Sequence, residues 1–269
     1  MISPLAAVHP EARLGEGVTV EPFTTIAADV EIGAGTWVGP NVTIMGGVRI
    51  GANCQIFPGA VVGAVPQDLK FAGEKTTVRI GDFTVLRECV TVNRGTVDRG
   101  ETTVGSHCLL MAYVHVAHDC IIGDHCILAN TVQVAGHVEI GDYAIVGGSS
   151  AIHQFVKIGP HAMISGGSLV RKDVPPYVKA GREPLTYAGV NTIGLRRRGF
   201  SDEAVALTQQ LYRILFLGAL NTHDALMQIE QELPATPERE LAVAFVRNAT
   251  RGILKSPKRG RAAENGEAE

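Results

Sequence analysis

The chain of 269 residues carries a formal net charge of −3, and 45% of its residues are hydrophobic, which is compatible with one large soluble domain or two. No apolar run approaches the 18 or so residues of a membrane span, and the N-terminus lacks a basic stretch followed by an apolar one. We therefore expect no membrane span and no signal peptide. Five cysteines without a CxxC pair favour free thiols in a reducing cytoplasm.

The charge is unevenly distributed along the chain. Residues 1–170 contain nine basic and fifteen acidic side chains, and residues 171–269 contain fifteen basic and twelve acidic ones. The positive C-terminal part suggests an acidic partner or a phosphate-bearing ligand. On charge alone, a solvated helical face is the simpler explanation, and we expect no nucleic-acid partner.

From the N-terminus onward, an aliphatic residue recurs at every sixth position. All 26 positions in this phase are Ile, Leu or Val, and they run from Ile2 to Val62, from Ile80 to Val92 and from Val104 to Val170. A period of six fits neither an α-helix nor an ordinary strand, but it is typical of a parallel β-helix, in which three hexads form one triangular coil. Residues 1–171 are therefore predicted to form a β-helix with these residues pointing inward.

Two insertions interrupt the phase, at about residues 63–75 and 93–99. Both follow the third hexad of a coil, so both loops should leave the same edge of the prism, and such loops often lie on a binding face.

Beyond the repeat, residues 172–255 are expected to form a linker and a small helical domain. Residues 173–185 are a Pro-rich connection, and helical patterns follow at 191–200, at 201–217 and from Thr222. The last helix should open at Thr236 and stop at Gly252. Residues 256–269 are expected to be a disordered tail.

The same phase places four histidines along one edge of the prism. These are His115, His118, His137 and His153, whereas His125 falls on a different face. Three interpretations remain open from the residues alone: a metal site, since Zn²⁺ often takes three His ligands, general base catalysis, or exposed surface histidines. Because neighbouring strand residues point to opposite sides, Asp119 is not expected to orient His118, and a loop carboxylate such as Asp68 is one alternative.

Several motifs together resemble one family. "QDLKFAGE", "RGTV", "AHDC", "AGHVEIGDYAIVGG", "AIHQF", "DVPPYV" and "GLRRRGF" occur in order between residue 2 and about 253. In this combination the chain resembles the UDP-N-acetylglucosamine O-acyltransferases, hexapeptide-repeat enzymes that begin lipid A biosynthesis. The resemblance implies a left-handed β-helix, a homotrimer, no cofactor and no metal. It also implies transfer of an (R)-3-hydroxyacyl group from acyl carrier protein to the 3-OH of UDP-N-acetylglucosamine.

The resemblance also implies roles for single residues. His118 would be the catalytic base and the backbone N–H of Gly136 the oxyanion donor, while Gly166 would limit acyl length. Substrate contacts would come from Asp68, Lys70, His115, His137, His153, Gln154, Asn191, Arg197 and Arg198. Asn93 departs from the family, because a relative has His there.

Two other functions remain open at this point. The same scaffold supports N-acyl transfer, including transfer to a 3-amino nucleotide sugar, and γ-class carbonic anhydrases bind a metal on it.

Overall fold

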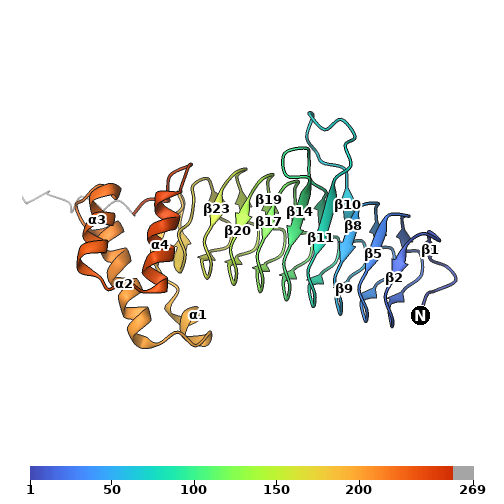
Figure 1. The fold of residues 1–269 in the computed structure, drawn as a ribbon, viewed down its shortest axis with the longest axis horizontal. Helices are drawn as coiled ribbons and strands as arrows, with labels where there is room; N and C mark the ends of the chain where they lie inside the picture. Colours follow the sequence, from blue (N-terminus) through green and yellow to red (C-terminus); the bar gives the residue numbers. More distant parts are fainter. Residues whose placement is uncertain (257–269) are drawn as a thin grey trace, which may run out of the picture.

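The computed structural model describes residues 1–256, and residues 1–170 form a triangular prism made of three parallel sheets (Figure 1). The prism is a left-handed parallel β-helix. Sheet I contains β1 (Ala7–Val8), β4 (Thr25–Ile26), β7 (Thr43–Ile44), β10 (Val61–Ala64), β13 (Thr91–Asn93), β16 (His115–Val116), β19 (Gln133–Val134), β22 (Ala151–Ile152) and β25 (Leu169–Val170).

The chain passes from sheet I to sheet II and then to sheet III in each coil. Sheet II contains β2 (Arg13–Leu14), β5 (Val30–Ile32), β8 (Val48–Ile50), β11 (Thr77–Ile80), β14 (Glu101–Val104), β17 (Ile121–Ile122), β20 (Glu139–Ile140) and β23 (Lys157–Ile158). Sheet III contains β3 (Thr19–Val20), β6 (Trp37–Val38), β9 (Gln55–Ile56), β12 (Val85–Leu86), β15 (Leu109–Leu110), β18 (Ile127–Leu128), β21 (Ile145–Val146), β24 (Met163–Ile164), β26 (Val178–Gly181) and β27 (Thr186–Val190). We name the corners of the prism edge I–II, edge II–III and edge III–I.

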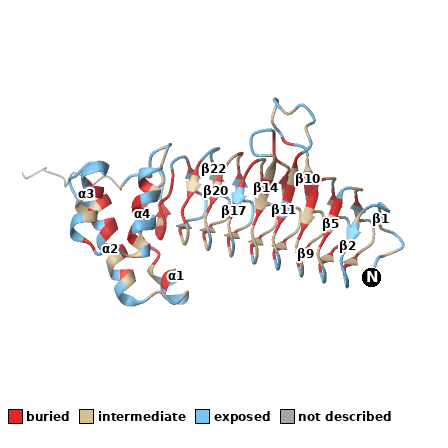
Figure 2. Ribbon diagram, in the orientation of Figure 1, coloured by how far each residue is buried: buried red, intermediate tan, exposed pale blue. Residues whose placement is uncertain are grey.

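The six-residue period is confirmed as the core of the prism. Uninterrupted coils stack in an 18-residue register, as Val116 pairs with Val134 and Val134 with Ile152. From Val20 to Val170, no aliphatic residue of the phase is more than 4% exposed. The first three, Ile2, Val8 and Leu14, are more exposed at the open N-terminal end. Figure 2 shows buried residues in strand after strand along the prism.

Both inserted loops leave the prism at edge I–II, as predicted. One connects β10 to β11 and the other connects β13 to β14, and both preceding strands belong to sheet I. In Figure 1 the two loops project together from one side of the prism. Asn93 joins their bases, because its side-chain amide donates to the carbonyl oxygen of Val65 at 3.0 Å.

The sheets continue beyond residue 171, where the six-residue repeat was predicted to stop. Within the Pro-rich connection, β26 pairs in parallel with β24 and antiparallel with β27. Its partner register is 16 residues, Ile164 with Ala180, instead of 18. The last coil is two residues shorter than the uninterrupted coils. Continuing the six-residue spacing from Val170 leads to Pro176, so the periodicity does not identify β26.

Within the described part of the chain, four helices cover the C-terminal end of the prism: α1 (Thr192–Arg197), α2 (Asp202–Leu217), α3 (Thr222–Glu232) and α4 (Pro237–Arg247). Ser201, Asn221 and Thr236 accept hydrogen bonds as N-caps of the last three. Tyr212 of α2 is fully buried and donates to the carbonyl oxygen of Pro176, which ties the helices to the prism.

The predicted end of α4 at Gly252 is wrong, because the helix ends at Arg247. The chain then turns back to the prism, where Ile253 bridges Asp173. Of the predicted tail, residues 257–269 lie outside the part that the structure describes. Within residues 1–256, no helix is long and apolar enough to cross a membrane.

Candidate active site

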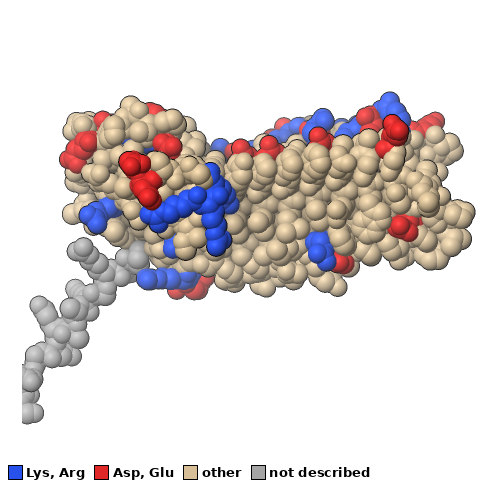
Figure 3. Space-filling model, turned by 90° about the horizontal axis from the view of Figure 1, so that it is seen from below, with Lys and Arg blue, Asp and Glu red and all other residues tan. Residues whose placement is uncertain are grey.

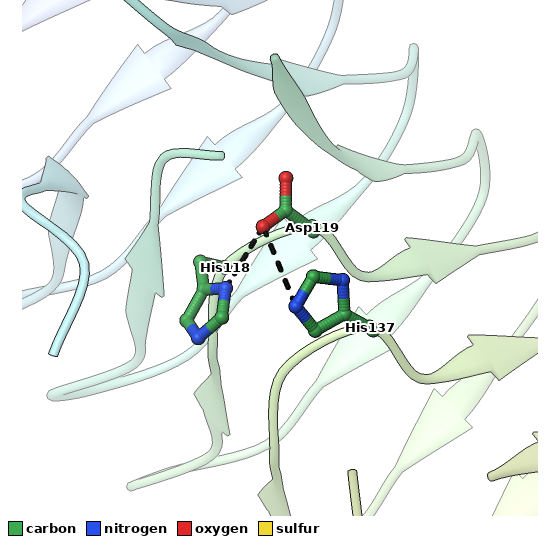
Figure 4. A group of neighbouring side chains, drawn as sticks. All are labelled: His118, Asp119 and His137. Carbon is green, nitrogen blue, oxygen red and sulfur yellow. Dashed lines mark hydrogen bonds and ion pairs between the residues drawn. The ribbon is translucent and has the colours of Figure 1, made fainter. Parts of the chain in front are cut away.

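The site is built around His118 and Asp119 at edge I–II (Figure 4). Nδ1 of His118 lies 2.8 Å from Oδ2 of Asp119. Asp119 is completely buried, and 13% of the His118 side chain is exposed. A hydrogen bond from Nδ1–H to a carboxylate fixes the tautomer in which Nε2 carries the free lone pair. The pair therefore has the form of an oriented general base.

The expectation that Asp119 does not face His118 is wrong. Alternation of side chains holds within a strand, but these two residues form the corner after β16, and Asp119 has a φ of 59°. This left-handed backbone turns the carboxylate back toward His118. Asp68 does not supply the orienting carboxylate: its Oδ1 accepts from the backbone N–H of Lys70, within their own loop.

Hydrogen bonds keep Asp119 ionised in its buried place. Burial alone raises the pKa of the carboxyl group, but the hydrogen bonds from Thr96, His118 and Arg99 outweigh burial, and the net pKa lies below the ordinary value. Asp119 is therefore a carboxylate at neutral pH.

His137 lies against this pair from the next coil. Its ring is perpendicular to that of His118, with centroids 5.0 Å apart, and its Nε2 lies 3.9 Å from Oδ2 of Asp119 (Figure 4). On its other side, Nδ1 of His137 is 3.2 Å from a carboxylate oxygen of Asp98. The two histidines thus meet within one chain, and our sequence analysis did not anticipate the contribution of Asp98.

Gly136 lies directly beneath the His118 ring. A Cβ atom at Gly136 would come within 2.7 Å of Nε2 of His118, so no side chain fits at this position without moving the imidazole. Among the described residues, no hydrogen bond has the backbone N–H of Gly136 as its donor, which leaves this group available to a ligand beside Nε2.

The other predicted residues of this edge lie nearby. His115 on β16 shares a hydrogen bond of 2.7 Å with Thr91, and burial, then the charge of His118, lowers its pKa. His153 and Gln154 are exposed in the coil after Gly136, and Nδ1 of His153 lies 3.1 Å from the carbonyl oxygen of Gln154.

Other predicted residues lie away from His118 in the same chain. Gly166 follows β24 at edge III–I. Asn191 is buried, caps α1 and donates to the carbonyl oxygen of His161. Arg198 lies over the ring of Tyr143, 5.2 Å from its centroid, beside edge II–III, and Arg197 precedes it on α1. A single prism does not bring these residues to His118.

The described residues contain one group that could hold a metal ion, formed by His118, Asp119 and His137. Their donor atoms all lie within 4.8 Å of one another. Two imidazoles and a carboxylate suit Zn²⁺. However, the hydrogen bond between His118 and Asp119 already uses two of the three donors.

The chain is similar to known proteins over almost its whole length. A family model described as UDP N-acetylglucosamine O-acyltransferase, domain 2, matches residues 173–254, and a model of bacterial transferase hexapeptide repeats matches residues 29–64 and 101–136. Two relatives are named acyl-[acyl-carrier-protein]–UDP-N-acetylglucosamine O-acyltransferase. The one from Sulfurihydrogenibium sp. is 59% identical over 94% of this chain and 93% of its own. The one from Chlorobaculum tepidum is 64% identical over 87% and 89%.

Solved structures agree with these relatives. A UDP-N-acetylglucosamine acyltransferase from Bacteroides fragilis superposes with a TM-score of 0.94 at 51% identity, covering 95% of this chain and all of its own. A structure from Acinetobacter baumannii gives 0.92 at 44% identity over 94% and 99%.

Proposed function

Because the chain belongs to the UDP-N-acetylglucosamine O-acyltransferases of lipid A biosynthesis, we propose that His118 is the general base of its acyl transfer. The enzyme transfers an (R)-3-hydroxyacyl group from acyl carrier protein to the 3-OH of UDP-N-acetylglucosamine. The observation that carries the proposal is the His118–Asp119 pair, with Nε2 next to the unoccupied N–H of Gly136.

This geometry supports the following reaction. Nε2 of His118 takes the proton of the 3-OH while the oxygen attacks the thioester carbon. The N–H of Gly136 stabilises the oxyanion of the tetrahedral intermediate. The intermediate collapses by breaking the C–S bond, and the leaving thiolate takes the proton from Nε2. Asp119 remains ionised throughout and stabilises the imidazolium that forms between the two proton transfers.

Alanine substitution tests the base directly. His118→Ala should lower kcat/KM by about 10²-fold or more without changing the melting temperature appreciably. His9→Ala is the matched control, because His9 is exposed in the first coil of the prism, far from His118, and it should retain activity. A His118→Ala enzyme within a few-fold of wild type would refute the assignment.

We propose a trimer because the three faces of the prism differ in character. The outward residues of sheet II are mainly charged, as in Glu31, Arg49, Glu139 and Lys157. Those of sheet III become apolar along the later coils: Val85, Leu109, Ile127, Ile145 and Met163. An apolar face packed on sheet I of the next chain, repeated three times, closes a ring and leaves sheet II in water.

The trimer also accounts for the scattered residues. In an assembly, edge I–II of one chain could meet edges of its neighbours, so that Gly166, Asn191, Arg197 and Arg198 reach the cleft of another chain's His118. Asp68, Lys70, His115, His137, His153 and Gln154 complete the proposed substrate contacts.

Mixed trimers test this arrangement. Neither His118→Ala nor a double variant, Arg197→Ala with Arg198→Ala, should be active alone. Refolded together they should regain about a quarter of wild-type activity, because one site in four takes intact residues from both chains. A mixture of His118→Ala and Asp119→Asn should regain none, since one chain supplies both residues. A stable, active monomer in sedimentation would contradict the trimer.

The remaining partners and alternatives follow from the family. We propose acyl carrier protein as the donor and the cytoplasm as the location. All five cysteines are free thiols, four of them buried, which suits that compartment. The relatives are named as O-acyltransferases, so the comparisons do not favour N-acyl transfer or a carbonic anhydrase. An assay with UDP-N-acetylglucosamine against its 3-amino analogue distinguishes O-acylation from N-acylation.

A further inference from the structure

The loop of residues 94–100, which interrupts the repeat, folds against Asp119. Thr96 is 6% exposed and donates twice to the carboxylate, from its backbone N to Oδ1 at 2.9 Å and from Oγ1 to Oδ2 at 2.6 Å. The backbone N of Arg99 donates to Oδ1 at 3.2 Å. With His118, the carboxylate accepts four hydrogen bonds, which is its full capacity.

The contacts of the Thr96 hydroxyl favour one direction for its proton. Its oxygen accepts from the backbone N–H of Asp98 at 3.3 Å, so its own proton is free to point at Asp119. The backbone N–H of Asp119 in turn donates to Oγ1 of Thr102, on β14 directly after the loop, at 2.8 Å. The inserted segment therefore holds the side chain of Asp119, and β14, which follows it, holds the main chain.

The same carboxylate oxygen serves both Thr96 and His118. Oδ2 accepts from Oγ1 of Thr96 and from Nδ1 of His118. Within residues 1–256, these two are the side chains that donate hydrogen bonds to Asp119. Without the hydroxyl, Oδ2 loses one of its two anchors, and rotation of the carboxylate would take its acceptor away from the imidazole.

We propose that Thr96 is a positioning residue for the acyl transfer: its hydroxyl holds Oδ2 of Asp119 in the place from which Asp119 orients His118. This inference rests on the proposed role of His118 as the base. It also explains the second interruption of the repeat. The inserted loop brings the Thr96 hydroxyl to the buried carboxylate of Asp119, which a regular corner would leave with fewer hydrogen bonds. Thr96 acts through Asp119 and does not touch the reacting atoms.

The kinetic test compares Thr96→Val, which keeps the shape and removes the hydroxyl, with Thr96→Ser, which keeps the hydroxyl. Displacing an oriented group costs roughly ten-fold to a hundred-fold in rate, so kcat and kcat/KM of Thr96→Val should fall together by that factor. The KM for the nucleotide sugar should hardly change, and Thr96→Ser should recover most of the activity. Val97→Ala is the control, because Val97 is 83% exposed in the same loop, and it should behave as wild type.

A spectroscopic test separates positioning from catalysis. The Nδ1 proton of His118, hydrogen-bonded to a buried carboxylate, should give a low-field proton resonance that is absent in His118→Ala. Thr96→Val should shift this resonance or broaden it by exchange with water, and Thr96→Ser should preserve it. If Thr96→Val fails to fold by thermal melting, Thr96→Ala takes its place in both tests.

Three results would contradict the positioning role of Thr96. A Thr96→Val enzyme with wild-type kcat, a serine variant as poor as the valine variant, or an unchanged His118 resonance would overturn the proposal. If the His118 resonance moves in Thr96→Val but His118→Ala stays active, His118 is not the general base, although Thr96 still positions it through Asp119.

Discussion

Gly46 and Gly136 occupy equivalent positions at edge I–II, each two residues after an inward aliphatic residue, yet only Gly136 lies under a histidine. A Cβ at Gly136 would approach Cε1 and Nε2 of His118 to 2.6 and 2.7 Å, whereas a Cβ at Gly46 would meet nothing within 4 Å. Neither glycine has a positive φ, so backbone strain does not separate them. The requirement for glycine at position 136 is therefore space for the imidazole.

We expect Gly136→Ala to lower kcat by about 10²-fold or more, because the new methyl group pushes the His118 ring away from the Gly136 amide that would bind the oxyanion. Steady-state kinetics of Gly136→Ala and Gly46→Ala measure the difference. Gly46→Ala should match wild type in activity and melting temperature. Equal activity in the two variants would show that catalysis does not require the His118 imidazole to lie against Gly136.

The possible metal ligands at the site lead to a prediction about chelators. Zn²⁺ would bind to the lone pair of a neutral imidazole and to the carboxylate of Asp119, the groups that now share a proton. Dialysis against a chelator should leave activity unchanged. Micromolar Zn²⁺ should inhibit reversibly, and Mg²⁺, which prefers oxygen ligands, should not. Loss of activity on chelation that Zn²⁺ restores would instead identify a metalloenzyme.

At the scale of the coil, the core was predictable and the corners were not. A period of six identifies the inward residues because each hexad places one aliphatic side chain in the prism, and burial from Val20 to Val170 confirms it. Corner residues such as Asp119 take positive φ, where strand alternation gives the wrong direction. For this reason the histidine edge was predictable but its orienting carboxylate was not.

Contacts made by inserted loops are also hidden from the sequence pattern. The period shows where residues 94–100 leave the prism, but not that Thr96 turns back onto Asp119 or that Asp98 meets His137. The strand β26 was missed for a related reason, since its coil is shortened by two residues. A periodic signal predicts the regular part of a solenoid, and each departure from it has to be seen in three dimensions.

Two adjacent isoleucines on β17 test the predicted inward phase. Ile122 is 2% exposed and points into the prism, whereas Ile121 is 43% exposed on sheet II. Ile122→Ala should lower the free energy of unfolding by about 2–5 kcal/mol, through lost burial and the cavity left behind. Ile121→Ala should change it by less than about 1 kcal/mol. Urea unfolding measures both, and equal costs would contradict the assignment of the core.

Edge II–III carries a column of stacked rings that makes stability depend on pH. Phe83, His107, His125, Tyr143 and His161 stack in this order, with centroids 4.5–4.9 Å apart. Burial, and then the charge of Arg198, lowers the pKa of His161 from 6.5 to about 4. The unfolded chain takes up this proton at a higher pH than the folded chain. The stabilisation is therefore full above pH 6.5 and is lost as the pH falls toward 4.

His161→Phe should remove this part of the pH dependence, because a phenyl ring fits the column and does not titrate. The melting temperature of the variant should fall less than that of wild type between pH 7 and pH 5. His107→Phe, in the same column but without the contact to Arg198, serves as the control. If His161→Phe loses as much stability as wild type on acidification, other groups govern the effect.

At the scale of the whole molecule, the structure shows where the basic side chains of the C-terminal part lie. Figure 3, seen from below, shows Lys and Arg side chains gathered where the helices meet the prism, on the face turned away from the loops that project at edge I–II in Figure 1. Most of the prism surface in this view carries few charges. A cavity of about 530 Å³ opens at this end, with Leu169 and Leu185 in its wall and Arg171, Arg182 and Lys255 around it. Arg251 in the same C-terminal part is only half-exposed, and its Nε is buried.

The cavity lies on the same edge of the prism as the proposed base. Lys172, which also lines the cavity, follows Val170 by two residues, as His118 follows Val116. It is therefore three coils from His118, or roughly 14 Å along the prism. An acidic carrier protein docked at this end could feed its phosphopantetheine arm along edge I–II to His118. We therefore expect the KM for acyl carrier protein, and not the KM for the nucleotide sugar, to depend on these charges.

Salt and charge reversal test the docking surface. Contacts of this kind mainly set the rate of encounter and are screened by ions, so the KM for acyl carrier protein should rise with ionic strength while the KM for UDP-N-acetylglucosamine changes less. Arg171→Glu and Lys255→Glu should raise the carrier KM alone. Arg213→Glu, on an exposed part of α2 away from the cavity, should leave both constants unchanged. A carrier KM that stays flat with salt, or reversals that weaken both substrates equally, would mean that the basic end is a solvated surface and that the carrier docks elsewhere.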